Sequence, residues 1–138
     1  MGSSTVDTNV SGKFEMVSGE NYDAYLRECG VGMIQRTLVG KAKETITIAI
    51  SGQQGEITFS IPIKTLTIRF SLGQEFSEDG LDERRTRSII VVEGNKLIHT
   101  QRFEGSECTV VRVVNNTEMI ATYTTKNVVA THTYKRIA

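Results

Sequence analysis

Hydrophobic, β-prone runs recur along most of the chain, and each is closed by a polar turn signal after about ten residues. The turns carry glycine and asparagine, which tolerate positive φ angles or tight bends, as in Gly94-Asn95, Gly105-Ser106 and Asn115-Asn116. We therefore predict nine strands, over residues 45–50, 56–61, 65–70, 75–77, 85–92, 96–103, 107–114, 117–124 and 128–136.

The part of the chain before Thr45 has a different pattern. Residues 10–17 favour one further strand. Residues 21–30 and 31–39 place hydrophobic side chains at helical spacing, and glycine ends both segments. A helix pair followed by a long antiparallel meander predicts an all-β fold, namely a ten-stranded antiparallel up-and-down β-barrel with a helix–turn–helix lid.

Length and composition fit a single domain. We expect residues 10–138 to form one β-barrel domain and residues 1–9 to be a flexible arm or a tag remnant. Hydrophobic residues make up 38% of the chain and tryptophan is absent. This composition fits either a barrel with a partly empty interior or an ordinary threonine-rich β domain.

The charges narrow the choice of partners. Sixteen basic and sixteen acidic residues cancel, which argues against nucleic acid as the main partner and against a DNA-binding role for the helix pair. No apolar stretch approaches the length of a membrane span, and no apolar signal segment follows the start. We expect a cytoplasmic monomer without metal or cofactor, with Cys29 and Cys108 as free thiols.

The last two turns allow the strand register to be worked out. With two-residue loops in both turns, Arg112 faces Met119, and Met119 in turn faces Tyr134. His132 lies beside this row, opposite Ala121. An inward face with such polar side chains points to a bound anionic ligand. Alternation alone leaves open whether this face lies inside or in solvent.

Six segments carry a resemblance to a known family. They are Gly12–Leu26 (GKFEMVSGENYDAYL), Gly30–Arg36 (GVGMIQR), Phe70–Glu78 (FSLGQEFSE), Leu81–Ser88 (LDERRTRS), Asn95–Gly105 (NKLIHTQRFEG) and Thr131–Arg136 (THTYKR). In this order they resemble the intracellular lipid-binding proteins, which comprise the fatty-acid-binding and cellular retinoid-binding proteins. The resemblance covers nearly the whole chain, and GQEF at Gly73–Phe76 favours the fatty-acid-binding branch.

The resemblance implies a ten-stranded clamshell that carries a long-chain fatty acid non-covalently and is not an enzyme. It also places Arg112 inside the cavity. In the family two arginines and a tyrosine hold the ligand carboxylate, and Arg112 and Tyr134 match the first arginine and the tyrosine. His132 stands where the second arginine is expected. Phe14 replaces the usual tryptophan, and Ile63 stands where fatty-acid-binding members often have a portal phenylalanine.

Elementary chemistry supports these assignments. Burial of a long acyl tail contributes roughly 10 kcal/mol, at about 0.8 kcal/mol per methylene. The carboxylate needs a buried partner, and Arg112 offers a permanent charge with a planar donor fork, while the hydroxyl of Tyr134 can donate a second bond. If His132 takes part as a cation, carboxylate affinity should strengthen as the pH falls toward its pKa. Alternatively His132 only packs, and a water-bridged Arg112 holds the head group.

Further site residues follow from the resemblance. Gln101 and Arg84 match positions that usually line the cavity, and Met119 shares the row of Arg112. On the lid, Tyr25, Val31 and Ile34 are expected to face the cavity. The basic residues at the lid are Arg36, Lys41 and Lys43. By resemblance they could touch anionic membranes during ligand transfer; the alternative is an ordinary solvated face.

Other classes of protein are weighed against this one. Within the family, Arg112 favours a carboxylate over an alcohol, which admits retinoic acid as an alternative ligand. A secreted lipocalin would share Gly12-Lys13-Phe14, but the early helix pair argues against it. An enzyme could use Cys108 with His99 or His132, yet no nucleophile motif or metal-ligand spacing occurs. An interaction protein with an empty barrel is a further alternative.

Overall fold

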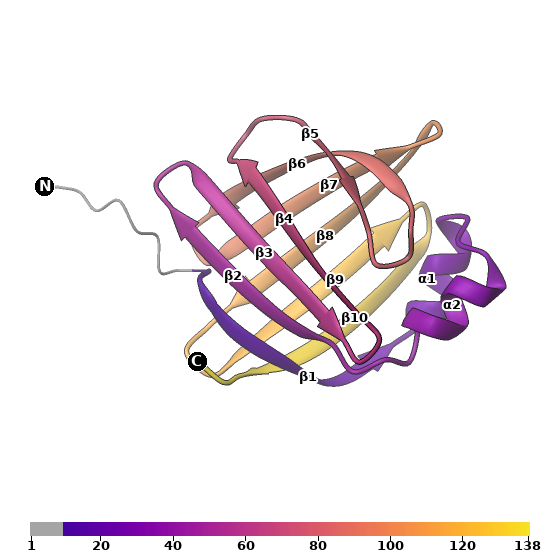
Figure 1. Cartoon of the computed structure of the whole chain (residues 1–138), viewed down its shortest axis with the longest axis horizontal. Coiled ribbons are helices and arrows are strands. Elements are labelled where there is room, and N and C mark those ends of the chain that lie inside the picture. Colours follow the sequence, from indigo (N-terminus) through magenta and orange to yellow (C-terminus); the bar gives the residue numbers. More distant parts are fainter. Residues whose placement is uncertain (1–9) are drawn as a thin grey trace, which may run out of the picture.

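The computed structural model describes residues 10–138, so the expected arm at residues 1–9 lies outside the described part. Within this range the chain forms ten strands and two short helices (Figure 1). In chain order they are β1 Gly12–Glu20, α1 Tyr22–Glu28, α2 Met33–Val39, β2 Thr45–Ser51, β3 Gln54–Ile61, β4 Lys64–Ser71, β5 Phe76–Asp79, β6 Arg85–Glu93, β7 Lys96–Phe103, β8 Ser106–Val114, β9 Glu118–Thr125 and β10 Val128–Arg136. The predicted all-β fold with a helix pair is confirmed.

All ten strands belong to one antiparallel sheet, in the order β4-β3-β2-β1-β10-β9-β8-β7-β6-β5. The sheet curls into a barrel, and the two helices cover one end of it (Figure 1). The edge strands β4 and β5 meet through side chains, because the rings of Phe70 and Phe76 stack with centroids 5.6 Å apart. Such closure leaves an interior that side chains from every wall can reach.

The barrel wall follows from alternation along the strands. In β8 every second side chain is buried, and the same alternation runs through β2 and β10. Hydrophobic side chains supply most of the interior, and the fully buried ones include Phe14, Ile46, Ile57, Ile90 and Leu97. Arg112 and His132 occupy the same inward series on their strands, so the polar face derived from the sequence lies inside.

The register between β8 and β9 differs from the prediction. Arg112 pairs with Ala121 rather than with Met119, so β9 is displaced by two residues. The cause is Asn115, whose Oδ1 accepts hydrogen bonds from the backbone N–H groups of Thr117 (2.9 Å) and Glu118 (2.8 Å) and so widens the loop. A slip of two residues keeps every side chain on its face.

The register between β9 and β10 agrees with the prediction. Met119 pairs with Tyr134, and Ala121 pairs with His132. Because Arg112 also pairs with Ala121, one row of the inner face runs from Arg112 through Ala121 to His132. His132, not Tyr134, is therefore in line with the arginine. On the far side of His132, Gly19 leaves room for the ring, since a Cβ there would lie 2.7 Å from Cδ2 of His132.

The lid is fixed to the barrel by polar contacts. Asn21 precedes α1 with φ of 64°, and its Nδ2 donates to the carbonyl of Val129 on β10 at 2.8 Å. Arg36 donates to Asp23 (3.1 Å) and to the carbonyl of Val31 (2.8 Å). Its side chain is thus only 14% exposed, and the expected basic edge at the lid lacks this residue.

The lid helices do not both face inward as expected. Tyr25 and Val31 are buried, but Ile34 is 75% exposed and points away from the cavity, which corrects its prediction. A helix of seven residues shows too few turns for its hydrophobic pattern to define one face. Within residues 10–138 no helix is long and apolar enough to cross a membrane.

Candidate functional site

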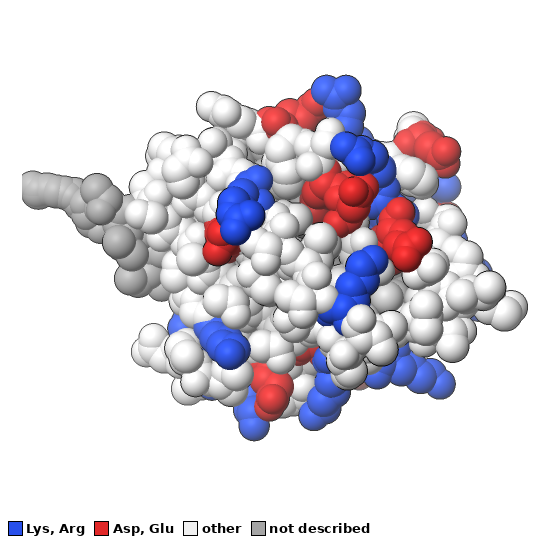
Figure 2. Space-filling view, viewed as in Figure 1, with Lys and Arg blue, Asp and Glu red and all other residues white. Residues whose placement is uncertain are grey.

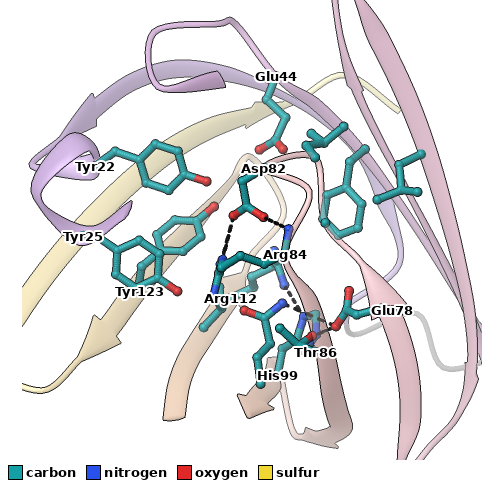
Figure 3. A pocket seen from close by; sticks show the side chains of 16 residues that line it. Tyr22, Tyr25, Glu44, Glu78, Asp82, Arg84, Thr86, His99, Arg112 and Tyr123 are labelled. Atoms are coloured by element: carbon teal, nitrogen blue, oxygen red, sulfur yellow. Dashed lines mark hydrogen bonds and ion pairs between the residues drawn. The ribbon is translucent and has the colours of Figure 1, made fainter. Parts of the chain in front are cut away.

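A cavity lies inside the barrel beneath α1 and contains about 600 Å³ of empty space, including its opening to solvent. Tyrosines form one side of it, and charged side chains reach in from several strands (Figure 3). The apolar part of the lining consists of Phe59, Leu66, Leu81 and Val110.

Arg112 on β8 is the central cation of the cavity and is 3% exposed. Its guanidinium carbon lies 5.5 Å from the ring centre of Phe59, and its Nη1 lies 3.5 Å from Nδ1 of His99. Among the described residues, its Nε has no hydrogen-bond partner. A buried N–H without a partner is costly, so this atom is ready for an acceptor brought by a ligand.

A buried carboxylate–imidazole pair lies behind Arg112. Oε2 of Glu78 on β5 is 2.5 Å from Nε2 of His99 on β7, and Gln101 donates to the same oxygen at 3.4 Å. Burial alone would raise the pKa of Glu78, but the hydrogen bond and charge of His99 outweigh it and lower the pKa to about 2. Glu78 therefore adds a fixed negative charge to the cavity wall.

The second arginine of the cavity already has a partner. Arg84 precedes β6 and contacts Asp82 through both Nε (3.1 Å) and Nη2 (3.0 Å). Both side chains are 9% exposed. Both donors converge on the same oxygen, Oδ2 of Asp82, and the ion pair compensates the charge of the guanidinium. Arg84 therefore offers less to a ligand than Arg112 does.

Tyr134 and His132 form a layer of hydroxyl and imidazole groups next to the cavity. The hydroxyl of Tyr134 donates to Oε1 of Glu44 at 2.6 Å. Nδ1 of His132 lies 3.2 Å from the hydroxyl of Tyr123 and 3.3 Å from that of Tyr134. Burial and, to a lesser extent, the nearby charge of Arg112 lower the pKa of His132 to about 4. His132 is accordingly neutral at physiological pH.

Glu44 is a cavity residue that no sequence pattern predicts. It lies in the segment before β2, lines the cavity and accepts the hydrogen bond of Tyr134. Burial raises its pKa, while the bond from Tyr134 and the charge of Arg112 oppose this shift. A loop carboxylate has no period by which its direction can be predicted. His99 and Glu78 were also missed as site residues, although His99 shares the inward face of Gln101 on β7.

The structure sorts the eight predicted ligand-binding residues into three groups. Four line the cavity, namely Arg112, Arg84, Gln101 and Tyr25. Three are buried next to it, namely Tyr134, His132 and Met119, and the first two reach it through hydroxyl and imidazole contacts. Ile63 is 67% exposed in the turn between β3 and β4, outside the cavity lining.

Aromatic rings connect these groups to the lid. Tyr22 on α1 packs against the ring of His132 with centroids 4.3 Å apart and against Tyr123 at 5.1 Å. Tyr25 packs against Tyr123 at 5.3 Å. Movement of α1 would therefore break these tilted ring contacts at the layer of Tyr123 and His132.

Fold and site together define a class of protein: a small ten-stranded clamshell with a helical lid and an internal cavity that contains buried cations. No family model matches the chain. Human fatty acid-binding protein 9 is 32% identical over 126 residues, which cover 91% of this chain and 96% of that protein. The chain belongs to the intracellular lipid-binding protein family, in its fatty-acid-binding branch, as the sequence segments predicted.

Solved structures agree with this assignment. A fatty acid-binding protein from brain tissue of Drosophila melanogaster is 35% identical, with a TM-score of 0.84 over 93% of this chain and 99% of that one. A Schistosoma mansoni fatty acid-binding protein in complex with arachidonic acid is 27% identical, with a TM-score of 0.90 over 99% of this chain and all of the other.

Proposed function

We propose that this protein is a cytoplasmic, non-enzymatic carrier that binds a long-chain fatty acid non-covalently in the barrel. Arg112 and Tyr134 hold the carboxylate, and neutral His132 replaces a second arginine as a hydrogen-bonding neighbour. The observation that carries the proposal is the buried guanidinium of Arg112, whose Nε lacks a partner in the cavity. The arachidonic acid bound by the Schistosoma mansoni relative supports the ligand class.

The head group must compete with Glu44 for Tyr134. That hydroxyl now donates to Glu44 at 2.6 Å, so a ligand carboxylate gains the bond only when Glu44 turns away or takes up a proton. The raised pKa of Glu44 favours its protonation. We infer that Glu44 lowers carboxylate affinity at high pH and releases Tyr134 as the pH falls.

The test is displacement of a fluorescent fatty acid by oleic acid and, separately, by retinoic acid. Arg112→Ala should weaken oleic acid binding at least about 30-fold, because loss of one partner of a buried charge pair costs about 2 kcal/mol or more. Arg102→Ala is the control, since Arg102 forms an exposed ion pair with Glu107. Equal affinities of the two variants for oleic acid would contradict the role of Arg112 in holding the carboxylate. Tighter binding of retinoic acid than of oleic acid would show that the ligand is a retinoid rather than a fatty acid.

We also propose transient contact between the lid and membranes. Met33 and Ile34 on α2 are 72% and 75% exposed, and the end of the molecule that carries α2 is largely uncharged on the face drawn in Figure 2. Met33→Gln with Ile34→Gln should slow transfer of a fluorescent fatty acid to anionic vesicles. Ile137→Gln, at an exposed position near the C-terminus, is the control; equal slowing by both would contradict the proposal.

A further inference from the structure

Two cysteines from distant parts of the chain meet beneath the lid. Cys29 caps the C-terminus of α1, and Cys108 faces inward from β8. Their sulfur atoms are 3.1 Å apart, although 79 positions separate them in sequence. Neither is bonded to another cysteine in the described part of the chain, and both are buried, with exposed fractions of 5% and 2%. The sequence indicated no such contact.

The surroundings make the two thiols unequal. Nη1 of Arg84 lies 3.7 Å from the sulfur of Cys108. The hydrogen bond from Cys29, then Thr125 and the charge of Arg84, lower the pKa of Cys108 against the opposing effect of burial. The bond to Cys108 and burial raise the pKa of Cys29. A stabilised thiolate beside a protonated thiol is the arrangement of an attacking and a resolving cysteine.

We propose that Cys29 and Cys108 form a dithiol site that hydrogen peroxide oxidises to a disulfide, tying the lid helix α1 to strand β8. The thiolate of Cys108 attacks one peroxide oxygen, the O–O bond breaks and hydroxide leaves, which gives a sulfenic acid. Cys29 then attacks that sulfur, and the hydroxyl group leaves with the proton of Cys29 as water. In total two thiols are oxidised, and one peroxide, with the two thiol protons, becomes two waters.

The bond would restrain the lid at the C-terminal end of α1. Cys29 ends α1, and the preceding residues Tyr22 and Tyr25 carry the ring contacts with the cavity. A covalent tie at Cys29 therefore opposes the movement of α1 by which a ligand would leave. This consequence for exchange rests on the proposed function, whereas the disulfide itself does not.

The test treats the reduced full chain with hydrogen peroxide, followed by peptide mapping without reductant. The expected result is a cross-linked pair of peptides containing Cys29 and Cys108 in the monomer. In Cys29→Ala, dimedone should trap a sulfenic acid at Cys108, and circular dichroism verifies that this variant is folded. Oxidation of Cys108 to sulfinic acid with Cys29 still free in the wild type, or cross-links between chains only, would overturn the proposal.

A second readout follows the lid. Release of a fluorescent fatty acid should be about tenfold slower from the oxidised chain than from the reduced chain, and unchanged by peroxide in Cys108→Ala. If the disulfide forms but the release rate of the fatty acid does not change, the claim that the disulfide restrains the lid is wrong. If the reduced chain binds no fatty acid probe, the proposed function fails while the peptide map still decides the disulfide.

Discussion

At the scale of single residues, the cavity holds more carboxylates than cations. Glu44, Glu78 and Asp82 line it together with Arg84 and Arg112. Asp82 is matched by Arg84, and Glu78 lies against His99. Glu44 accepts a hydrogen bond from Tyr134 and is influenced by the charge of Arg112, so a ligand carboxylate bound at Arg112 would be repelled by it. The empty site thus already contains a carboxylate near the anchor, in competition with the head group.

This competition predicts a pH dependence that belongs to Glu44. Because its pKa is raised, Glu44 becomes neutral as the pH falls toward that value, and repulsion of the ligand carboxylate is lost. Fatty acid affinity of the wild type should therefore increase as the pH falls from neutral toward the raised pKa of Glu44, while Glu44→Gln should bind more tightly at neutral pH and show a flatter profile. Isothermal titration across this range measures both, and parallel profiles would contradict the role of Glu44.

His132 is not the source of this dependence. The sequence-based hypothesis placed a charge change at His132 within reach of physiological pH, but burial lowers its pKa to about 4. Between pH 8 and 6 the ring stays neutral, and His132→Gln should leave the pH profile of affinity unchanged in shape. The sequence shows which residue replaces the arginine; the environment that keeps it neutral depends on packing against Tyr22 and Tyr123.

Glu78 predicts how stability responds to acid. Its pKa in the folded state falls from 4.5 to about 2, so its ionised form stabilises the fold above pH 4.5, and this contribution is lost as the pH falls toward 2. The contribution is up to roughly 3 kcal/mol. Glu78→Gln should be less stable than the wild type at pH 7, and the difference should shrink at pH 3.

Urea unfolding at the two pH values measures this difference. Glu107→Gln is the control, because the side chain of Glu107 is 55% exposed. A constant gap between wild type and Glu78→Gln at pH 7 and pH 3 would show that Glu78 acts through packing rather than through its charge.

At the scale of elements, turn chemistry accounts for both the success and the error of the sequence analysis. Glycine and asparagine marked most strand ends to within a few residues, since these residues tolerate positive φ, as Gly94 (61°) and Gly105 (79°) do. The turn between β3 and β4, at Pro62-Ile63, is an exception. The loop at Asn115 is longer than the two residues predicted, because Val114 pairs with Met119 rather than with Thr117. The sequence does not show which backbone groups an asparagine side chain will bond. The prediction of which side chains face inward still holds, because the register of β9 is shifted by two residues and a shift by an even number keeps each side chain on its face.

Asn115 should therefore stabilise the β8–β9 connection. Its Oδ1 accepts from the backbone of Thr117 and Glu118. Asn115→Ala should lower the free energy of unfolding by about 1–2 kcal/mol through loss of these bonds. Denaturant unfolding measures the effect, and Asn116→Ala in the same loop is the matched control. Equal stability of the two variants would mean that backbone contacts alone set the loop.

At the scale of the whole molecule, the barrel was predictable and the composition of its cavity only in part. Strand count, lid and the inward position of Arg112 followed from turns, register and family segments. Glu44 and the Cys29–Cys108 contact did not, because each joins a segment before β2 to a distant strand. Such contacts depend on how the lid packs against the barrel, and local hydrophobic and turn patterns in the sequence do not predict this packing.

The central claim concerns what occupies the barrel. The most direct measurement is native mass spectrometry of the purified chain, followed by organic extraction and identification of the lipid. The account predicts one long-chain fatty acid per chain, absent from Arg112→Ala and retained by Arg102→Ala. A co-purified lipid without a carboxylate, or an empty barrel that also fails to bind a fluorescent fatty acid, would contradict it.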